Sequence, residues 1–234
     1  MLAVLYDVHG NLPALEAVIA DAEAAGADCW ILGGDYALFG GWPAETVERL
    51  RGLERASWIR GNGERWTADP DAAPDNPVVP GAVATARAAL GEETVADLAS
   101  LPFSLPHEGI LVCHGSPLSD VDSFAPDDGE RDEELLDGVD ARRVLFGHTH
   151  VPFARTSAGG VELVNPGSVG MPFDGDPRAA YALLADDGRI EHRRVEYDHG
   201  AAAERVRGIG EEWSEVVARR IEQSRMDVRP SAEG

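Results

Sequence analysis

The chain has 234 residues, of which 44% are hydrophobic and 26% are charged, so it is long enough for one large packed domain. Its formal net charge is −22, from 42 acidic and 20 basic residues, and every basic residue is an arginine. A surface this acidic repels a phosphate backbone, which argues against stable nucleic-acid binding. A site that handles phosphate on such a protein needs local positive charge, which bound metal ions can supply.

The sequence carries no sign of a membrane segment. No run approaches the roughly 18 consecutive apolar residues of a membrane span, and no N-terminal export signal is visible. We therefore expect no membrane association and a cytoplasmic location. Cys29 and Cys113 both lie in apolar runs, so we expect two reduced thiols in the core.

Strands and helices alternate in the N-terminal part of the chain. The apolar run 2–6 predicts a strand, and Asn11 followed by Pro13 predicts the start of a helix that ends near Gly26. The next elements are predicted as strand 29–32, helix 44–55 and strand 57–59. Because strands and helices alternate, we expect a parallel sheet.

The remaining chain is predicted to complete a single domain, residues 1–234, with two insertions. The first, about 67–105, combines a proline-rich acidic loop to Pro80 with helices 82–90 and 92–99; the second, about 118–140, is acidic and mostly loop or short helix. Strands are predicted at 110–113, 143–146 and 161–164, a hairpin at 180–185 and 189–195, a helix at about 201–224, and frayed residues through Gly234.

Polar, glycine-flanked residues follow the predicted strands at their carboxyl ends. They are Asp7, His9, Asp35, Asn62, His114, His148 and His150. Ligands of open α/β sheets bind beyond these strand ends, so the seven residues should converge on one edge. Carboxylates, an amide and imidazoles form a ligand set that suits manganese, iron, cobalt or zinc.

The order of these motifs, D-x-H-G-N, G-G-D, G-N-x-E, H-G and G-H-T-H, resembles the calcineurin-like metallophosphoesterases, and most closely their small bacterial and archaeal phosphodiesterase branch. The resemblance runs from Leu2 to about Leu184 and implies a four-layered α/β/β/α sandwich. It implies one metal ion on Asp7, His9, Asp35 and His150, and a second on Asp35, Asn62, His114 and His148. Asp35 would bridge the two ions, and catalysis would fall to Asp35, Asn62 and His114.

The resemblance also implies an activity. Two divalent ions, manganese first and iron, zinc, cobalt or nickel as alternatives, would activate a bridging hydroxide that hydrolyses a phosphoester. The expected enzyme is a phosphodiesterase or phosphatase acting on a small phosphorylated substrate, such as a nucleotide or a dinucleoside polyphosphate. A homo-oligomer stays open. Two alternatives also stay open: a phosphoprotein phosphatase, and a non-catalytic metal-binding scaffold of the same fold.

One position departs from the family pattern. The family usually has G-N-H-[DE], and here Gly63 stands in place of the histidine that contacts the scissile phosphate. Three explanations stay open: a substrate with a good leaving group, a substitute acid such as Glu64 or Arg65, or weak catalysis.

Three further questions concern the residues around the predicted site. The first is whether Arg60 and Arg65 bind phosphate or pair with acidic side chains. The second is whether the segment Asn165–Ser168 shapes the rim of the site or contacts the substrate. The third is whether four large apolar residues line a substrate pocket or pack in the core: Phe39, Trp42, Met171 and Phe173.

Overall fold

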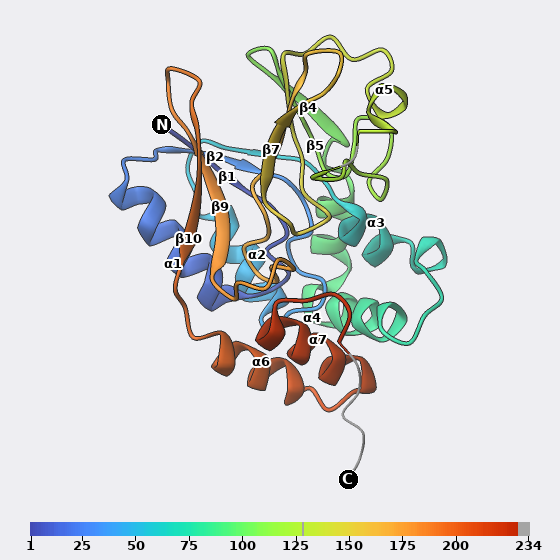
Figure 1. Ribbon diagram of the computed structural model, residues 1–234. Coiled ribbons are helices and arrows are strands. Elements are labelled where there is room, and N and C mark those ends of the chain that lie inside the picture. Colours follow the sequence, from blue (N-terminus) through green and yellow to red (C-terminus); the bar gives the residue numbers. More distant parts are fainter. Residues whose placement is uncertain (128, 229–234) are drawn as a thin grey trace.

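The computed structural model describes residues 1–127 and 129–228, and it contains two five-stranded sheets flanked by helices (Figure 1). The first sheet has the order β10-β9-β1-β2-β3, with strands β1 (Leu2–Leu5), β2 (Cys29–Leu32), β3 (Ala56–Trp58), β9 (Ala179–Leu184) and β10 (Ile190–Val195). The second has the order β4-β5-β6-β8-β7, with strands β4 (Ser104–His107), β5 (Ile110–Cys113), β6 (Arg143–Leu145), β7 (Phe153–Thr156) and β8 (Glu162–Asn165).

Each sheet has a parallel centre. Strands β1, β2 and β3 run parallel, as do β5, β6 and β8. The neighbouring strands β9, β4 and β7 pair antiparallel with these centres, and β10 pairs antiparallel with β9. The seven predicted site residues come after the carboxyl ends of five of the six parallel strands, namely β1, β2, β3, β5 and β6.

The helices are α1 (Leu12–Ala24), α2 (Pro43–Arg51), α3 (Asn62–Ala68), α4 (Val79–Ala99), α5 (Asp132–Leu135), α6 (His199–Arg207) and α7 (Glu212–Gln223), with a short 3-10 turn at Pro70–Ala72. Helix α1 begins as predicted: the Asn11 side chain accepts a hydrogen bond from Ala14 N at 3.3 Å. No helix of the described part of the chain is long and apolar enough to cross a membrane.

Alternating side chains in the strands create the layers. In β1, Ala3 and Leu5 pack toward α1, whereas Val4 and the following Tyr6 pack between the sheets against Val112. In the second sheet, Val144 and Phe146 face outward and are covered by Phe124 and Leu135. The expected four-layered sandwich is therefore confirmed, although its outer layer over the second sheet is only the four-residue α5 and its flanking loops.

Three expectations need correction. The predicted helix 201–224 is two helices, α6 and α7, because the glycines at 208 and 210 interrupt it, Gly210 with φ of 80°. The edge strands β4 and β7 were not predicted. Cys29 is only half-buried, whereas Cys113 is buried as expected.

Other expectations hold in detail. Two helices, 82–90 and 92–99, were predicted in the stretch 79–99. In the structure, helix α4 is interrupted between them at Gly91, whose φ is 74°. The proline-rich segment is irregular apart from the 3-10 turn and its two ends, which belong to α3 and α4. The predicted fraying through Gly234 concerns residues 229–234, which lie outside the described residues.

Helices α4, α6 and α7 pack together beside the sandwich (Figure 1). Gly81 of α4 lies directly against Trp213 of α7: a Cβ at this glycine would stand 2.5 Å from the indole Cδ1. This close approach fixes α7 against α4, and it positions one wall of the cleft described below.

Candidate active site

The seven predicted residues lie together where the parallel strands end. Asp7 and His9 follow β1, Asp35 follows β2, Asn62 begins α3, His114 follows β5, and His148 and His150 follow β6. Six of them are buried, and His148 is half-buried. Five of them, Asp7, His9, Asp35, His148 and His150, have positive φ between 48° and 65°. Non-glycine residues seldom adopt this left-handed backbone, and where they do it often marks a functional site.

Two groups of side chains have the spacing of metal ligands. The first is Asp7, His9 and His150, and the second is Asp7, Asp35 and His114; within each, the ligand atoms lie within 4.8 Å of one another. In the first group, His9 Nε2 lies 3.0 Å from His150 Nε2, which lies 3.6 Å from Asp7 Oδ1. In the second, His114 Nε2 lies 3.7 Å from Asp7 Oδ1 and 3.5 Å from Asp35 Oδ1.

Asp7 and Asp35 both connect the two groups. Asp7 belongs to each of them, whereas the resemblance assigns the bridging role to Asp35. The Asp35 carboxylate divides its oxygens: Oδ1 faces His114, and Oδ2 lies 3.9 Å from His9 Nε2. The geometry therefore lets Asp35 reach both groups at once.

Asn62 and His148 adjoin the second group. One end of the Asn62 side-chain amide lies 2.8 Å from His148 Nδ1 and 3.1 Å from His114 Nε2. With nitrogen at this end the amide donates to both imidazoles, and with oxygen there it faces only acceptors, as a metal ligand does.

Backbone carbonyls orient three of the imidazoles. The Nδ1 atoms of His9, His114 and His150 lie 3.0, 2.8 and 2.6 Å from the carbonyl oxygens of Leu38, Gly33 and Met171. Such a contact places the proton on Nδ1, so each Nε2 presents a lone pair to the site. This is the tautomer that a metal-binding imidazole needs.

The charge balance of the site also favours a cation. Burial, aided by the charge of Asp35, raises the pKa of Asp7 to about 8, and burial raises the pKa of Asp35 well above its usual range. Burial lowers the pKa of His9 to about 3 and that of His148 to about 4. Asp7 Oδ1 is buried and has no hydrogen-bond partner among the described residues. Buried carboxylates without a partner are costly, and a bound cation would relieve that cost.

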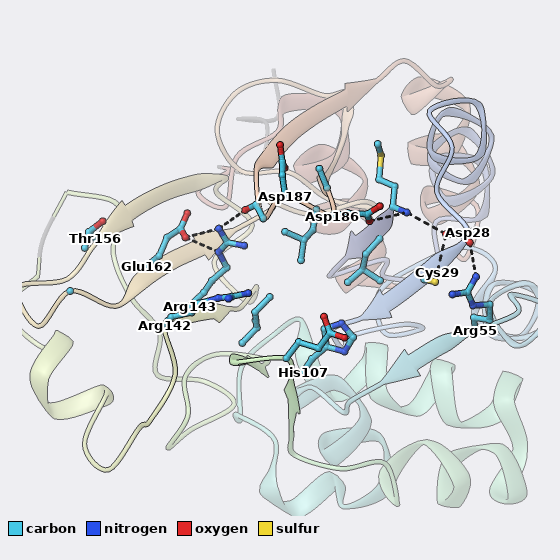
Figure 2. A pocket seen from close by; sticks show the side chains of 18 residues that line it. Asp28, Cys29, Arg55, His107, Arg142, Arg143, Thr156, Glu162, Asp186 and Asp187 are labelled. Carbon is cyan, nitrogen blue, oxygen red and sulfur yellow. Dashed lines mark hydrogen bonds and ion pairs between the residues drawn. The ribbon is translucent and has the colours of Figure 1, made fainter.

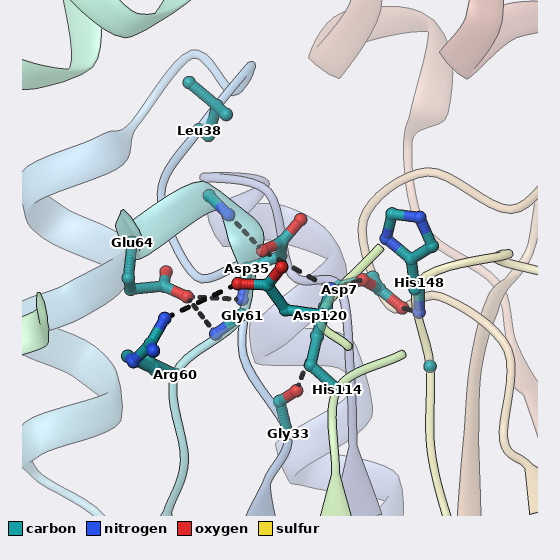
Figure 3. Close-up of polar contacts among 12 residues, drawn as sticks. Asp7, Gly33, Asp35, Leu38, Arg60, Gly61, Glu64, His114, Asp120 and His148 are labelled. Atoms are coloured by element: carbon teal, nitrogen blue, oxygen red, sulfur yellow. Dashed lines mark hydrogen bonds and ion pairs between the residues drawn. The ribbon is translucent and has the colours of Figure 1, made fainter. Parts of the chain in front are cut away.

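Glu64 organises the loops of the site (Figure 3). Its buried carboxylate accepts hydrogen bonds from the backbone N–H groups of Asp35 at 2.9 Å, Tyr36 at 2.9 Å and Gly61 at 2.8 Å. Glu64 thus joins the loop after β2 to the start of α3. A signal for this role is present in the sequence, because a Glu at the third helical position is typical of a capping box, whereas Glu64 was predicted only as a possible acid.

Asp120 was not identified from the sequence either. It accepts two hydrogen bonds from Arg65, at 2.7 and 2.6 Å, and lies 3.4 Å from Arg60. Both arginines thus pair with an acidic side chain, which was one of the two alternatives predicted for them. The pairing keeps the pKa of Asp120 below its usual value against the effect of its burial, which by itself raises it.

Gly63 leaves no room for a side chain without a shift of its neighbours. A Cβ at this position would stand 2.9 Å from Asp35 Oδ1, to which Gly63 N donates a hydrogen bond at 2.7 Å. The glycine therefore permits a close contact between α3 and Asp35.

The segment Asn165–Ser168 holds the backbone of two loops that carry candidate ligands. Ser168 Oγ donates to the Asp7 carbonyl at 2.7 Å, and Asn165 Nδ2 donates to the Gly147 carbonyl at 2.9 Å. Both side chains are completely buried. They shape the loops that carry Asp7 and His148, and they do not reach the surface where a substrate would bind.

A cleft of about 830 Å³ opens onto the candidate ligands. His9, Asp35, Asn62, His148 and His150 are among its polar lining residues. Phe39, Met171 and Phe173 line it, as one expectation held, whereas Trp42 is not part of its lining. The size suits a small organic ligand.

A second hollow, of about 960 Å³, lies at the opposite ends of the strands (Figure 2). Charged residues line it, including Arg143, which pairs with Glu162, and Arg55, which pairs with Asp28. None of the seven predicted residues borders it.

Comparison with known proteins gives a consistent family. Residues 1–188 match the calcineurin-like phosphoesterase superfamily domain. The chain is 29% identical over 229 aligned positions to an uncharacterised protein of Methanocaldococcus jannaschii, MJ0912, covering 88% of this chain and 91% of that one. It is 28% identical over 198 positions to the phosphodiesterase YfcE of Escherichia coli, covering 77% and 85%.

A solved structure agrees over nearly the whole length. The metallophosphoesterase from Sphaerobacter thermophilus is 29% identical and superposes with a TM-score of 0.82, covering 95% of this chain and 98% of that one. Together with the family match and the metal-ligand geometry at the strand ends, this likeness shows that the chain belongs to the calcineurin-like phosphoesterase superfamily and is a phosphoesterase.

Proposed function

We propose that this chain hydrolyses a phosphodiester or phosphoanhydride with two divalent metal ions bound at the strand ends. One ion would be held by Asp7, His9, Asp35 and His150, and the other by Asp35, Asn62, His114 and His148. The observation that carries the proposal is the pair of ligand groups, which share Asp7 and between which Asp35 divides its two oxygens. Manganese is the first expected metal, and iron, zinc, cobalt and nickel suit the same ligands.

Two bound divalent ions would create a positive centre on an acidic protein. Two divalent ions would contribute +4 and the carboxylates of Asp7 and Asp35 −2, so the two ions and these carboxylates together would carry +2. Bound divalent ions supply water activation and stabilisation of the phosphoryl oxygens. The surplus charge attracts a phosphate anion even though the chain as a whole has a charge of −22.

The surroundings of Gly63 favour a substrate with a good leaving group. Both oxygens of Glu64 accept backbone hydrogen bonds, and Arg65 is held by Asp120. Neither residue is free to protonate a leaving oxygen in place of the family histidine, and a strongly basic leaving group depends most on that proton. The likeness to a phosphodiesterase supports the same substrate class.

The test is hydrolysis of bis-p-nitrophenyl phosphate and p-nitrophenyl phosphate, with manganese and after chelation. We expect metal-dependent turnover, faster on the diester. Asp35→Asn and His148→Ala should each lower it by about 100-fold or more, because ligand loss costs more than the roughly 10–100-fold typical of groups behind the ligands. His107→Ala is the matched control, because His107 lies in the hollow at the opposite strand ends.

The other outcomes select the alternatives. A faster rate on the monoester would favour a phosphatase, including a phosphoprotein phosphatase. If the folded protein turns over neither ester with any of the five metals, the proposed phosphodiester hydrolysis is wrong, and the result favours the non-catalytic scaffold.

A further inference from the structure

Helix α7 contributes a wall of the cleft from outside the matched family region. The family domain ends at residue 188, and α7 spans Glu212–Gln223. Val216 and Arg220, one helical turn apart, line the same cleft as His9 and Asp35, and Met226 follows them. The family motifs therefore do not account for these three positions.

Arg220 differs from the other arginines near the site. Arg65 pairs with Asp120, and Arg219 pairs with Glu215 at 2.6 Å. Arg220 forms no ion pair within the described residues, and its Nε donates to the Met226 carbonyl at 3.1 Å. Burial lowers the pKa of its guanidinium, and only Asp227 partly offsets this effect. In a chain with 42 acidic residues, a half-buried arginine that forms no ion pair among the described residues can bind another anion.

The position of Arg220 is fixed relative to the candidate metal ligands. Trp213 anchors α7 against Gly81 of α4. At the other end of α7, Gly175 N donates to the Ser224 carbonyl at 3.0 Å, which ties the helix end to the loop after β8. The same loop carries Met171, whose carbonyl orients His150. The arginine and the first ligand group thus share one supporting loop.

Apolar side chains lie around Arg220 in the cleft. Phe39, Trp66, Val78, Phe173 and Val216 are among its lining residues. Val121 and Met226, which also line it, are 43% and 52% exposed, and they are two of the four large apolar side chains that the described residues leave exposed. Exposed apolar surface inside a cleft favours an organic ligand.

We propose that Arg220 binds a second phosphate group of the substrate, whose organic part lies on the apolar wall of the cleft. The substrate class is an organic diphosphate or a related phosphoanhydride, with one phosphate at the ligand groups and the next at the guanidinium. A planar guanidinium is well suited to a phosphate because it donates paired hydrogen bonds. The inference rests on the proposed function for the position of the first phosphate.

The experiment measures the dissociation constants of AMP and of methylene-bridged ADP, which cannot be cleaved between its phosphates. Calorimetry on the manganese-loaded full chain gives both values for the wild type, Arg220→Gln, Arg220→Lys and Arg225→Gln. Arg225 is the matched control, since it is an exposed arginine five residues on that does not line the cleft.

We expect Arg220→Gln to weaken the binding of methylene-bridged ADP by about tenfold more than the binding of AMP. Arg220→Lys should recover part of that difference, and Arg225→Gln should match the wild type. An equal effect of Arg220→Gln on both nucleotides, or none, would overturn the proposal, as would a wild type that binds neither.

Binding separates this inference from catalysis. If the wild type fails to hydrolyse bis-p-nitrophenyl phosphate but shows the Arg220-dependent preference for the diphosphate, the hydrolytic function is wrong and the phosphate subsite stands. If turnover is present and the preference is missing, the hydrolase stands and the subsite is wrong.

Discussion

Asp7 is a buried carboxyl group with only part of its hydrogen-bonding capacity satisfied. Its carboxyl is completely shielded, receives one hydrogen bond from His148 N at 3.0 Å and leaves Oδ1 without a partner among the described residues. Burial raises its pKa from 3.8 to about 8. Between these two pH values, the folded metal-free chain therefore keeps a proton on Asp7 that the unfolded chain releases.

From the raised pKa of Asp7 we predict how the free energy of unfolding of the metal-free protein depends on pH. A raised pKa of Asp7 gives stability that is lost as pH rises toward about 8. The lowered pKa values of His9 and His148 act in the opposite direction, but only below their unfolded value of 6.5. Between pH 6.5 and 8, urea unfolding of the chelated protein should therefore show a falling free energy of unfolding, by up to about 1.4 kcal/mol per pH unit for one proton.

Two comparisons check that slope. Asp7→Asn should reduce it by about one proton, because Asn does not titrate. Added manganese should oppose it, because metal binding needs the carboxylate. A free energy of unfolding that rises from pH 6.5 to 8, or an unchanged slope in Asp7→Asn, would contradict the account.

Glu64 acts on the candidate ligands through the backbone. In Glu64→Gln an amide NH2 replaces one oxygen and faces N–H donors, which should cost about 1–3 kcal/mol of stability. Since Asp35 and Asn62 depend on the same loops, manganese affinity should fall roughly 10–100-fold. Titration of metal into both proteins tests this, with Glu92→Gln as control, because the Glu92 side chain is 97% exposed. Unchanged metal affinity in a less stable Glu64→Gln would limit Glu64 to a role in folding.

At the scale of elements, the sequence predicted what periodicity and strand-end motifs encode. The helix at Asn11–Gly26 and the central strands follow from apolar spacing and caps, and they are confirmed. The edge strands β4 and β7 were missed because each is half-buried and one contains Pro106. The break between α6 and α7 was missed because the amphipathic pattern continues across Gly208 and Gly210, and only the glycines interrupt it.

The seven candidate residues were predictable for a similar reason. Each follows a strand and lies in a motif, so the sequence places all seven at the carboxyl ends of strands, and the packing of the two sheets brings these ends together. Arg220 and Asp120 could not be predicted, because they come from segments that carry no motif and reach the site only through packing. Their roles depend on how α7 and the loop 117–124 fold over the strand ends.

At the scale of the whole molecule, two sheets form a frame that gathers charge at one edge. One apolar cluster lies between the two sheets, and others cover their outer faces. The candidate ligand groups lie at the carboxyl ends of strands from both sheets. A net charge of −22 makes this edge attractive to cations and unattractive to phosphate until cations are bound. For the proposed function, this charge predicts that metal binds before substrate.

The number of metal ions bound per chain is the decisive measurement for the proposed two-metal site. The chain is loaded with manganese, passed through gel filtration to remove weakly bound ions from its acidic surface, and analysed for metal per chain. We expect two tightly held ions in the wild type and the loss of both in Asp35→Asn, since Asp35 reaches both ligand groups. A wild type that keeps one ion or none, or an Asp35→Asn variant that keeps two, would contradict it.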